Sequence, residues 1–302
     1  MAIEALPRPA EPRAEPAAPQ RSVSLWSDAF DRLRRNRMAM FGLLVILLLV
    51  CVAIAGPALA PYGYNEQRLV AGEVNRGPGW PHLLGTDDFG RDVFSRILYG
   101  ARTALAVGVI VVGIELVIGL SVGSLAGYFG GWVDGLFMRL TDIMFAFPGL
   151  LFAILIVAVL GPGLTNVFVA LGVVSWPGMA RLVRGQVLSI KRRDYVEAAR
   201  AVGSSDARII LLHVLPNSLG PIVVSASLGM GTAILAESSL SFIGIGVQAP
   251  APSWGSMINE AMNEWHTAPH LVLAPGAVIA LVVFAFNFLG DGLNDALNPR
   301  RR

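Results

Sequence analysis

The chain has 302 residues, of which 54% are hydrophobic and only 15% are charged, and its mean hydropathy is +0.62. A soluble domain of this length rarely carries so few charges, so the composition predicts an all-α, polytopic membrane protein. The formal net charge of +2 is too small to indicate nucleic acid as a partner. The single cysteine, Cys51, excludes a disulfide framework within the chain.

The first 37 residues divide into two parts. Residues 1–24 are rich in Pro, Ala, Glu and Arg without apolar periodicity, which predicts a disordered cytoplasmic tail. Residues 25–37, LWSDAFDRLRRNR, place apolar side chains on one helical face and arginines beside it. This pattern predicts an amphipathic helix at the membrane interface that leads into the first span.

Six apolar segments follow and predict a transmembrane domain over residues 38–302. Each segment is long enough to cross a hydrocarbon core of about 30 Å. The third carries Arg139 and Asp142 in its first half, and its sequence predicts a bend near Pro148. The six segments cover approximately 38–60, 103–127, 137–160, 164–184, 218–245 and 271–290.

The placement of Lys and Arg predicts that both termini are cytoplasmic, because basic residues collect on that side of a membrane. Arginines precede the first segment, and three more, 300–302, follow the sixth. Residues 186–216, which are rich in Lys and Arg, become a cytoplasmic loop. Residues 61–102, whose arginines are matched by acidic residues, and residues 246–270, which have no Lys or Arg, become external.

The cytoplasmic loop contains the polar stretch YVEAARAVGSSDARIILLHVLPN, between two long apolar segments. Asp194 and Glu197 have the spacing of a capping box at a helix start. Gly203 fits a helix C-cap with positive φ, and a second helix over 207–214 is expected to stop at Pro216. Two short helices around a glycine corner predict a docking surface for a partner, whereas the simpler interpretation is an ordinary charged loop.

This stretch resembles the EAA loop of ABC importer permeases, which reads Glu-Ala-Ala, three residues, Gly, nine residues, Ile, one residue, Leu-Pro. His213 occupies the position of the Ile, with Leu212 and Val214 beside it to supply apolar contact. The resemblance implies that the loop couples the chain to ATPase subunits. The residues that match, and that the resemblance assigns to coupling, are Glu197, Ala198, Ala199, Gly203, Leu215 and Pro216.

Four further stretches resemble signatures of the dipeptide, oligopeptide and nickel group of importer permeases. They read HLLGTDDFGRDVFSRILYGAR (82–102), AGYFGGWVD (126–134), QAPAPSWG (248–255) and FNFLGDGLNDALNP (286–299). Together they resemble the second membrane subunit of that group, the C type, over nearly all of residues 25–299. The resemblance implies a type I ABC importer permease fold in a bacterial plasma membrane, with di- or oligopeptide cargo. Glutathione, nickel or another small cargo is the alternative.

The chain has no ATP site of the P-loop kind, because its only lysine, Lys191, lacks the required Gly before it and Ser or Thr after it. We therefore expect a transport subunit that is not an enzyme and binds no cofactor itself. The resemblance implies that two partner ATPase subunits use ATP and Mg²⁺. It also implies a homologous permease as a heterodimer partner and an external substrate-binding protein on the outer face.

Carboxylates inside apolar segments are expensive in a membrane and are often functional. Glu115 lies near the centre of the second segment, where it either lines the translocation pathway or is hydrogen-bonded against a neighbouring helix. Glu237 lies beside serines, and the resemblance implies that its segment lines the pathway. The pathway candidates are Glu115, Glu237, Ser238 and Ser241.

Other features are interpreted more simply. The external loop 246–270 predicts a short helix, with Trp254 and Trp265 as aromatic anchors at the membrane interface. The four histidines are scattered and lack the spacing of metal ligands, so no metal is expected. An ion-driven secondary transporter and a membrane-embedded enzyme remain rival interpretations, although the sequence shows neither inverted repeats nor an acid–base pair.

Overall fold

The computed structural model describes residues 25–70 and 72–297, so the predicted tail (1–24) and the arginines at 300–302 lie outside the described residues. The described residues form helices joined by turns and irregular segments, with no strand and one isolated bridge between Thr86 and Asp92. The all-α prediction is therefore confirmed for this part of the chain.

The chain begins with α1 (Leu25–Arg35) and α2 (Arg37–Leu59), which are separated at Asn36. The Asn36 side chain caps α2 by accepting hydrogen bonds from the Met38 and Ala39 amides at 3.1 and 3.2 Å. The later helices are α3 (Val93–Phe129), α4 (Gly131–Ala146), α5 (Gly149–Leu160), α6 (Leu164–Ile190), α7 (Asp194–Ala201), α8 (Asp206–Ile209), α9 (Leu215–Phe242), α10 (Trp254–Glu260) and α11 (His270–Leu297).

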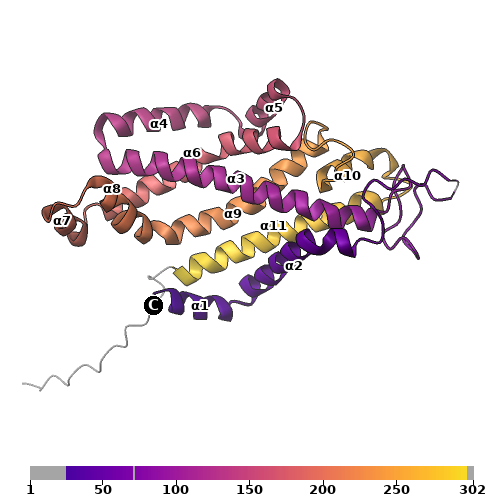
Figure 1. Cartoon of the computed structure of the whole chain (residues 1–302), viewed down its shortest axis with the longest axis horizontal. Coiled ribbons are helices and arrows are strands. Elements are labelled where there is room, and N and C mark those ends of the chain that lie inside the picture. The colour runs from indigo at the N-terminus through magenta and orange to yellow at the C-terminus, as the bar shows by residue number, and fades with distance from the viewer. Residues whose placement is uncertain (1–24, 71, 298–302) are drawn as a thin grey trace, which may run out of the picture.

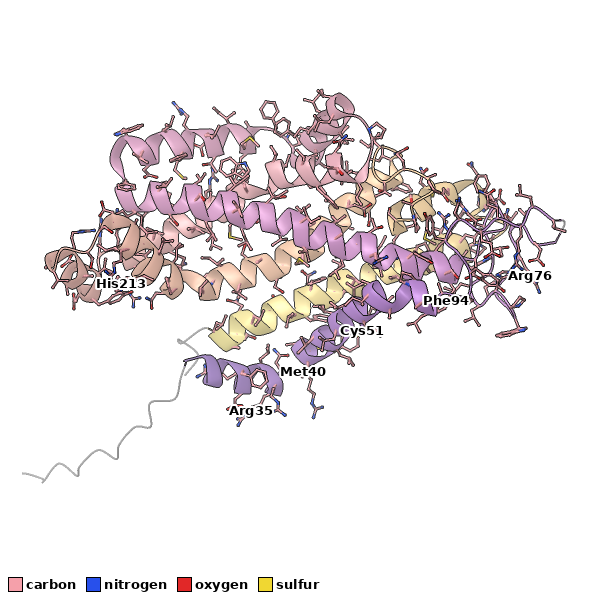
Figure 2. The ribbon with its side chains drawn as sticks, in the orientation of Figure 1. Arg35, Met40, Cys51, Arg76, Phe94 and His213 are labelled. Carbon is pink, nitrogen blue, oxygen red and sulfur yellow. The ribbon has the colours of Figure 1, made fainter. Side chains whose placement is uncertain are left out.

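The long helices run back and forth between two ends of an elongated bundle (Figure 1). One end carries α1, α7, α8 and the last turns of α11, and we call it the cytoplasmic end because basic residues surround it. The other carries the irregular segment 60–92 and α10, and we call it the external end. Figure 2 shows His213 near the first end and Arg76 at the second. The start of α1 and the end of α11 therefore lie at the same end of the bundle, and the cytoplasmic orientation of that end stays a prediction.

Five helices are long and apolar enough to cross a membrane: α2, α3, α6, α11 and the continuous helix Asp206–Phe242 that contains α9. The helices α4 and α5 meet the same criteria together but are bent by 87° between Ala146 and Gly149. Pro148 lies in this break, because its ring restricts the residue before it and cannot continue the hydrogen bonding of α4. Counting the bent pair as one span gives the six predicted crossings, and the predicted bend is confirmed.

The third helix begins earlier than the apolar pattern indicates. Hydropathy marks residues 103–127, but α3 already begins at Val93, where the Asp92 side chain accepts a hydrogen bond from the Ser95 amide at 2.7 Å. Its first turns contain buried Arg96, which a hydropathy scan counts against a span. The irregular part of the predicted external segment 61–102 therefore ends at Asp92.

Small residues bring α3 and α6 into close contact. A side chain on Gly119 would collide with Met179, and one on Gly123 would collide with Val183 and with the Ala180 backbone. Glycine at these positions lets the two helices approach more closely than larger residues allow. The helices α4, α7 and α8 pack against this α3–α6 pair.

The external loop packs more deeply than predicted. The α10 helix starts at Trp254, and Ser253 and Ser256 form a capping box there. Trp254 is only 2% exposed and donates a hydrogen bond from Nε1 to the Ile97 carbonyl at 3.1 Å. The prediction that Trp254 anchors the loop at the membrane interface is therefore wrong, because the α3 backbone satisfies its polar atom inside the fold. Trp265 is exposed.

Candidate functional site

The polar cytoplasmic stretch folds as α7 and α8, but α7 is not capped as predicted. Arg193 is the N-cap, and its carbonyl accepts hydrogen bonds from the Val196 and Glu197 amides at 2.9 and 3.2 Å. Asp194 is the first helical residue, so its side chain has no capping geometry, and the predicted capping box is wrong. Asp194 and Glu197 still lie in the first turn, where the helix dipole favours carboxylates.

Gly203 ends α7 as predicted, with a φ of +84° that side-chain-bearing residues rarely adopt. The Gly203 amide donates to the Arg200 carbonyl at 3.0 Å, and the Ser204 amide donates to the Ala199 carbonyl at 3.1 Å. These two hydrogen bonds form a Schellman motif, which turns the chain sharply at the end of α7. The glycine corner between two short helices is thereby confirmed.

The second helix does not stop at Pro216, so that prediction is wrong. The chain continues from α8 through a π-helical turn, Ile210–Val214, directly into α9, and Pro216 lies in the first turn of α9. The Leu215 amide donates to the Ile210 carbonyl, five residues back. The wider turn accommodates a proline that has no amide hydrogen to donate. As a result, α8 is rigidly continuous with a membrane-spanning helix.

The buried side of this element is apolar. Val196 of α7 and Ile209 and Val214 of the following turns are fully buried, in one cluster with Val183 and Val187 of α6. Glu197 and Ala198 are exposed, and Ala199 is half-buried. Val202 is 83% exposed beyond the end of the helix. The element thus buries one side and leaves Glu197 and Ala198 on its exposed side.

Polar contacts attach both halves of the element to the cytoplasmic end of α3. The Tyr128 hydroxyl donates to Asp206 Oδ1 of α8 at 2.6 Å and accepts from Arg200 Nη2 of α7 at 3.3 Å. This hydrogen bond raises the pKa of the exposed Arg200 guanidinium. Lys191 Nζ donates to the Gly127 carbonyl at 2.7 Å, at the negative end of the α3 dipole. Tyr128 therefore bridges the glycine corner.

His213, which replaces the Ile of the motif, is half-buried in the π-helical turn. Of the two neighbours expected to supply apolar contact, Val214 is buried but Leu212 is 58% exposed. Ile209 and Ile210 complete the contact instead. The departure from the motif therefore leaves the packing of the element intact.

Three of the predicted pathway residues, Glu237, Ser238 and Ser241, form a buried cluster at the external end of α9. Glu237 is 1% exposed and accepts a hydrogen bond from the Ser241 hydroxyl at 2.6 Å. Ser241 Oγ also accepts from the Val247 amide at 3.0 Å. A side chain on Gly255 would collide with the backbone of Ser238, so the external loop lies directly on these serines.

Glu115 belongs to a different part of the fold. Its Oε2 lies 3.3 Å from the position that a Cβ on Gly229 of α9 would take, and it makes no hydrogen bond or ion pair with any described residue. Gly229 precedes Glu237 by about 12 Å along α9, from the rise of an α-helix. The structure therefore does not bring the two carboxylates together.

Ion pairs between α4 and α6 were missed by the sequence analysis. Asp134 accepts two hydrogen bonds from Arg184, from Nε at 2.5 Å and from Nη2 at 2.6 Å. Arg181 Nη2 donates to Asp142 Oδ1 at 2.5 Å, and these two side chains are 48% and 56% exposed. The presence of charges within the third apolar segment was a usable signal, because charges inside spans are often functional.

The described residues contain no group of three or more His, Cys, Asp or Glu side chains able to hold a metal ion. What the fold presents is a bundle of spans, an exposed two-helix element at its cytoplasmic end and a folded cap at its external end. These features define a polytopic membrane protein with an exposed element at one end of its bundle.

Comparison with known families agrees with this class. Residues 119–302 match the family described as the binding-protein-dependent transport system inner membrane component. Residues 24–78 match the N-terminal transmembrane domain of oligopeptide transport permease C. The chain therefore belongs to the family of inner membrane components of binding-protein-dependent transport systems, and it is a multi-pass inner membrane protein.

Curated relatives match almost the whole chain. The dipeptide transport system permease protein DppC of Alkalihalophilus pseudofirmus is 46% identical over 295 residues, which cover 97% of this chain and 96% of the relative. The glutathione transport system permease protein GsiD of Escherichia coli O6:K15:H31 is 46% identical over 275 residues, which cover 91% and 90%. Both relatives are named as permease proteins of transport systems.

A solved structure supports the fold. An inward-facing conformation of the MetNI methionine ABC transporter matches with a TM-score of 0.56 and 21% identity, over 67% of this chain and 96% of the matched chain. At this identity the match establishes the fold alone, which is the predicted type I ABC importer permease fold.

Proposed function

We propose that this chain is the C-type membrane subunit of an ATP-driven importer of small peptides. Support comes from the two relatives above, whose names specify a dipeptide and glutathione, which is itself a small peptide. Both are equally identical to this chain, so their common chemistry, a short peptide, is the cargo class that we propose. Nickel has no support from the arrangement of His, Cys, Asp and Glu side chains in the described residues.

The observation that carries the coupling part of the proposal is the exposed Glu-Ala-Ala side of α7 on a firmly attached element. An ATPase subunit contacts Glu197, Ala198 and Ala199, and Gly203 sets the angle between α7 and α8. Leu215 and Pro216 carry the movement into α9, because α8 and α9 are continuous. The rigid element then moves with α3 and α9 as the ATPases close.

The remaining parts of the transporter are supplied by other chains. Two ATPase subunits bind ATP and Mg²⁺ and hydrolyse ATP, a homologous permease completes the pathway as a heterodimer, and an external substrate-binding protein delivers the peptide. The external cap formed by segment 60–92 and α10 is the surface on which that protein docks. The chain itself contributes half of the pathway and no catalysis.

Glu115, Glu237, Ser238 and Ser241 stay predictions as pathway residues. Glu237 and Ser241 are enclosed within the subunit, so we propose that they act by fixing the external loop on α9 next to the pathway. Glu115 is only 9% exposed and makes no hydrogen bond or ion pair with a described residue, so it is the candidate whose carboxylate has no partner within the described part of the subunit. Unchanged uptake kinetics in Glu115→Gln would remove it from the pathway.

The proposal is tested by reconstituting the complete complex in liposomes and measuring peptide uptake and ATP hydrolysis together. Glu197→Lys reverses a charge on the exposed side of α7, and Gly203→Val forces a branched side chain into a positive φ. Both variants are expected to insert in the membrane but to transport less peptide per ATP hydrolysed. Asp31→Lys, which reverses an exposed charge on α1, is the matched control. Full transport by both variants would contradict the coupling role.

A further inference from the structure

The outer surface of α4 carries exposed charges within a predicted membrane span. Of the α4 residues only Thr141 is buried, whereas Arg139 and Asp142 are exposed. At about 1.5 Å per residue, Asp142 lies about 8 Å inside the predicted apolar segment 137–160, and its partner Arg181 lies about 5 Å inside the cytoplasmic end of segment 164–184. Both side chains therefore belong to predicted membrane spans and not to the loops between them.

Charges at this depth do not face lipid, because the hydrocarbon core offers neither water nor hydrogen bonds to them. Asp142 and Arg181 are about half exposed in the isolated subunit, so what they face is not part of this chain. A water-filled pathway between two permeases satisfies them. The exposed surface of α4 and α6 around this pair is therefore the wall of the pathway.

The chemistry of the cluster matches a peptide with free ends. Arg139 lies one turn before Asp142 on α4 and makes no ion pair with any described residue, so the cluster of Arg139, Asp142 and Arg181 offers one carboxylate and two guanidiniums. The guanidinium of Arg181 is also 4.3 Å from the centre of the Phe145 ring, which is itself 51% exposed. An aromatic face beside a charge pair provides an apolar contact for a side chain of the cargo.

We propose that Arg139, Asp142 and Arg181 form a contact site for the charged ends of a short peptide in transit, with Asp142 accepting from the α-amino group and the arginines donating to the α-carboxylate. This inference rests on the proposed peptide import. Without cargo, Asp142 and Arg181 compensate each other, so the empty pathway carries no isolated carboxylate. With cargo, each exchanges its partner for a peptide terminus.

The Asp134–Arg184 pair provides the internal comparison. It joins the same two helices nearer the cytoplasmic end, but its hydrogen bonding is bidentate and its side chains are less exposed, at 21% and 33%. That geometry is typical of a structural ion pair that holds α4 against α6. The single hydrogen bond of the Asp142–Arg181 pair fits a contact that can open.

Accessibility to a water-soluble reagent tests the site directly. Cys51 is the only cysteine of the chain, so Cys51→Ser removes the background from this subunit. In the full complex, with the other subunits also free of cysteine, Asp142→Cys is expected to react with a membrane-impermeant methanethiosulfonate. A saturating dipeptide, delivered by the binding protein, is expected to slow that reaction about tenfold. Leu44→Cys, exposed on the outer side of α2, is the lipid-facing control and is expected to stay unreactive.

Each result decides the matter. An unreactive Asp142→Cys would mean that lipid or the partner permease covers the site, and reaction without protection by the dipeptide would mean a water-filled wall that cargo does not touch. Either result overturns this inference. Peptide import itself is checked separately, because Cys51→Ser with native Asp142 must still take up the dipeptide.

Uptake measurements provide the second test. Asp142→Asn and Arg181→Gln keep the side-chain size and remove the charge, and each is expected to lower the maximal rate of dipeptide uptake by about tenfold or more, with normal assembly. Asp134→Asn is expected to lower the amount of folded complex but not uptake per complex. Unchanged uptake in both Asp142→Asn and Arg181→Gln would contradict the site.

Discussion

At the external end, Arg91 and Arg96 are almost completely buried and both donate to Glu260 Oε2, at 2.6 and 3.0 Å. At the cytoplasmic end, Glu197 and Arg200 of α7 are exposed, and few polar contacts hold the helix in place. Buried charges that satisfy one another make a stiff cap, whereas exposed charges leave a surface for a partner. The two ends therefore differ in what they present, a closed charge network outside and an exposed surface on a firmly packed element inside.

The largest effect on stability is expected when a buried charge is removed from the external end. Arg96→Leu leaves Glu260 and Asp87 without one of their two guanidinium partners in a buried setting. We expect a loss of stability of about 3 kcal/mol, because the two carboxylates lose charge-assisted contacts and keep only Arg91 as a guanidinium partner. Thermal denaturation of the detergent-purified subunit, followed by size-exclusion chromatography, measures the change.

The matched control is Arg68→Leu, since Arg68 forms an exposed ion pair with Glu66 at 3.0 Å in the same external segment. The Arg68 guanidinium lowers the pKa of Glu66, but water replaces it readily. We expect no measurable shift in the melting temperature. Equal losses in the two variants would show that the buried network is not what stiffens the cap.

A smaller effect is expected where the external loop rests on α9. Ser241→Ala removes a hydrogen bond to Glu237 and another from the Val247 amide, and it leaves both groups buried without that partner. The expected loss of stability is about 1–3 kcal/mol. Ser239→Ala, which removes only a hydroxyl bonded to the Leu235 carbonyl on the same helix, should unfold at the normal temperature.

The smallest change in stability, with a specific change in function, is expected at the cytoplasmic end. Tyr128→Phe removes the hydroxyl that bridges Arg200 and Asp206, but water can reach exposed Asp206, so the loss is about 1 kcal/mol. We expect peptide transported per ATP to fall, because the glycine corner is then no longer fixed to α3 through this hydroxyl. Tyr195→Phe, on exposed α7, should keep the normal ratio, and an equal decrease in that control would remove the special role of Tyr128.

Local signals predicted much of the fold. Hydropathy located the spans, Pro148 marked the bend, and Gly203 marked the corner, because each of these depends on residues close together in the chain. The Glu-Ala-Ala motif of α7 was found from its spacing, and Glu197 and Ala198 are exposed whereas Ala199 is half-buried.

Long-range pairing could not be predicted in the same way. Arg91 and Glu260 are 169 residues apart in the chain, and Arg181 and Asp142 are 39 apart, so no periodicity connects them. Pro216 was misjudged for a related reason, since the π-helical turn that accommodates it is stabilised by tertiary burial of Ile210 and Val214. In each case the decisive contact comes from packing between elements.

The central claim is that the exposed side of α7 passes ATPase motion into the bundle. Its most direct test is the ratio of peptide imported to ATP hydrolysed in liposomes that contain the complete complex with Glu197→Lys in this subunit. The account predicts that the ratio falls well below that of the Asp31→Lys control while the complex remains assembled and the α7 helix stays folded. A ratio equal to that of the control would contradict it.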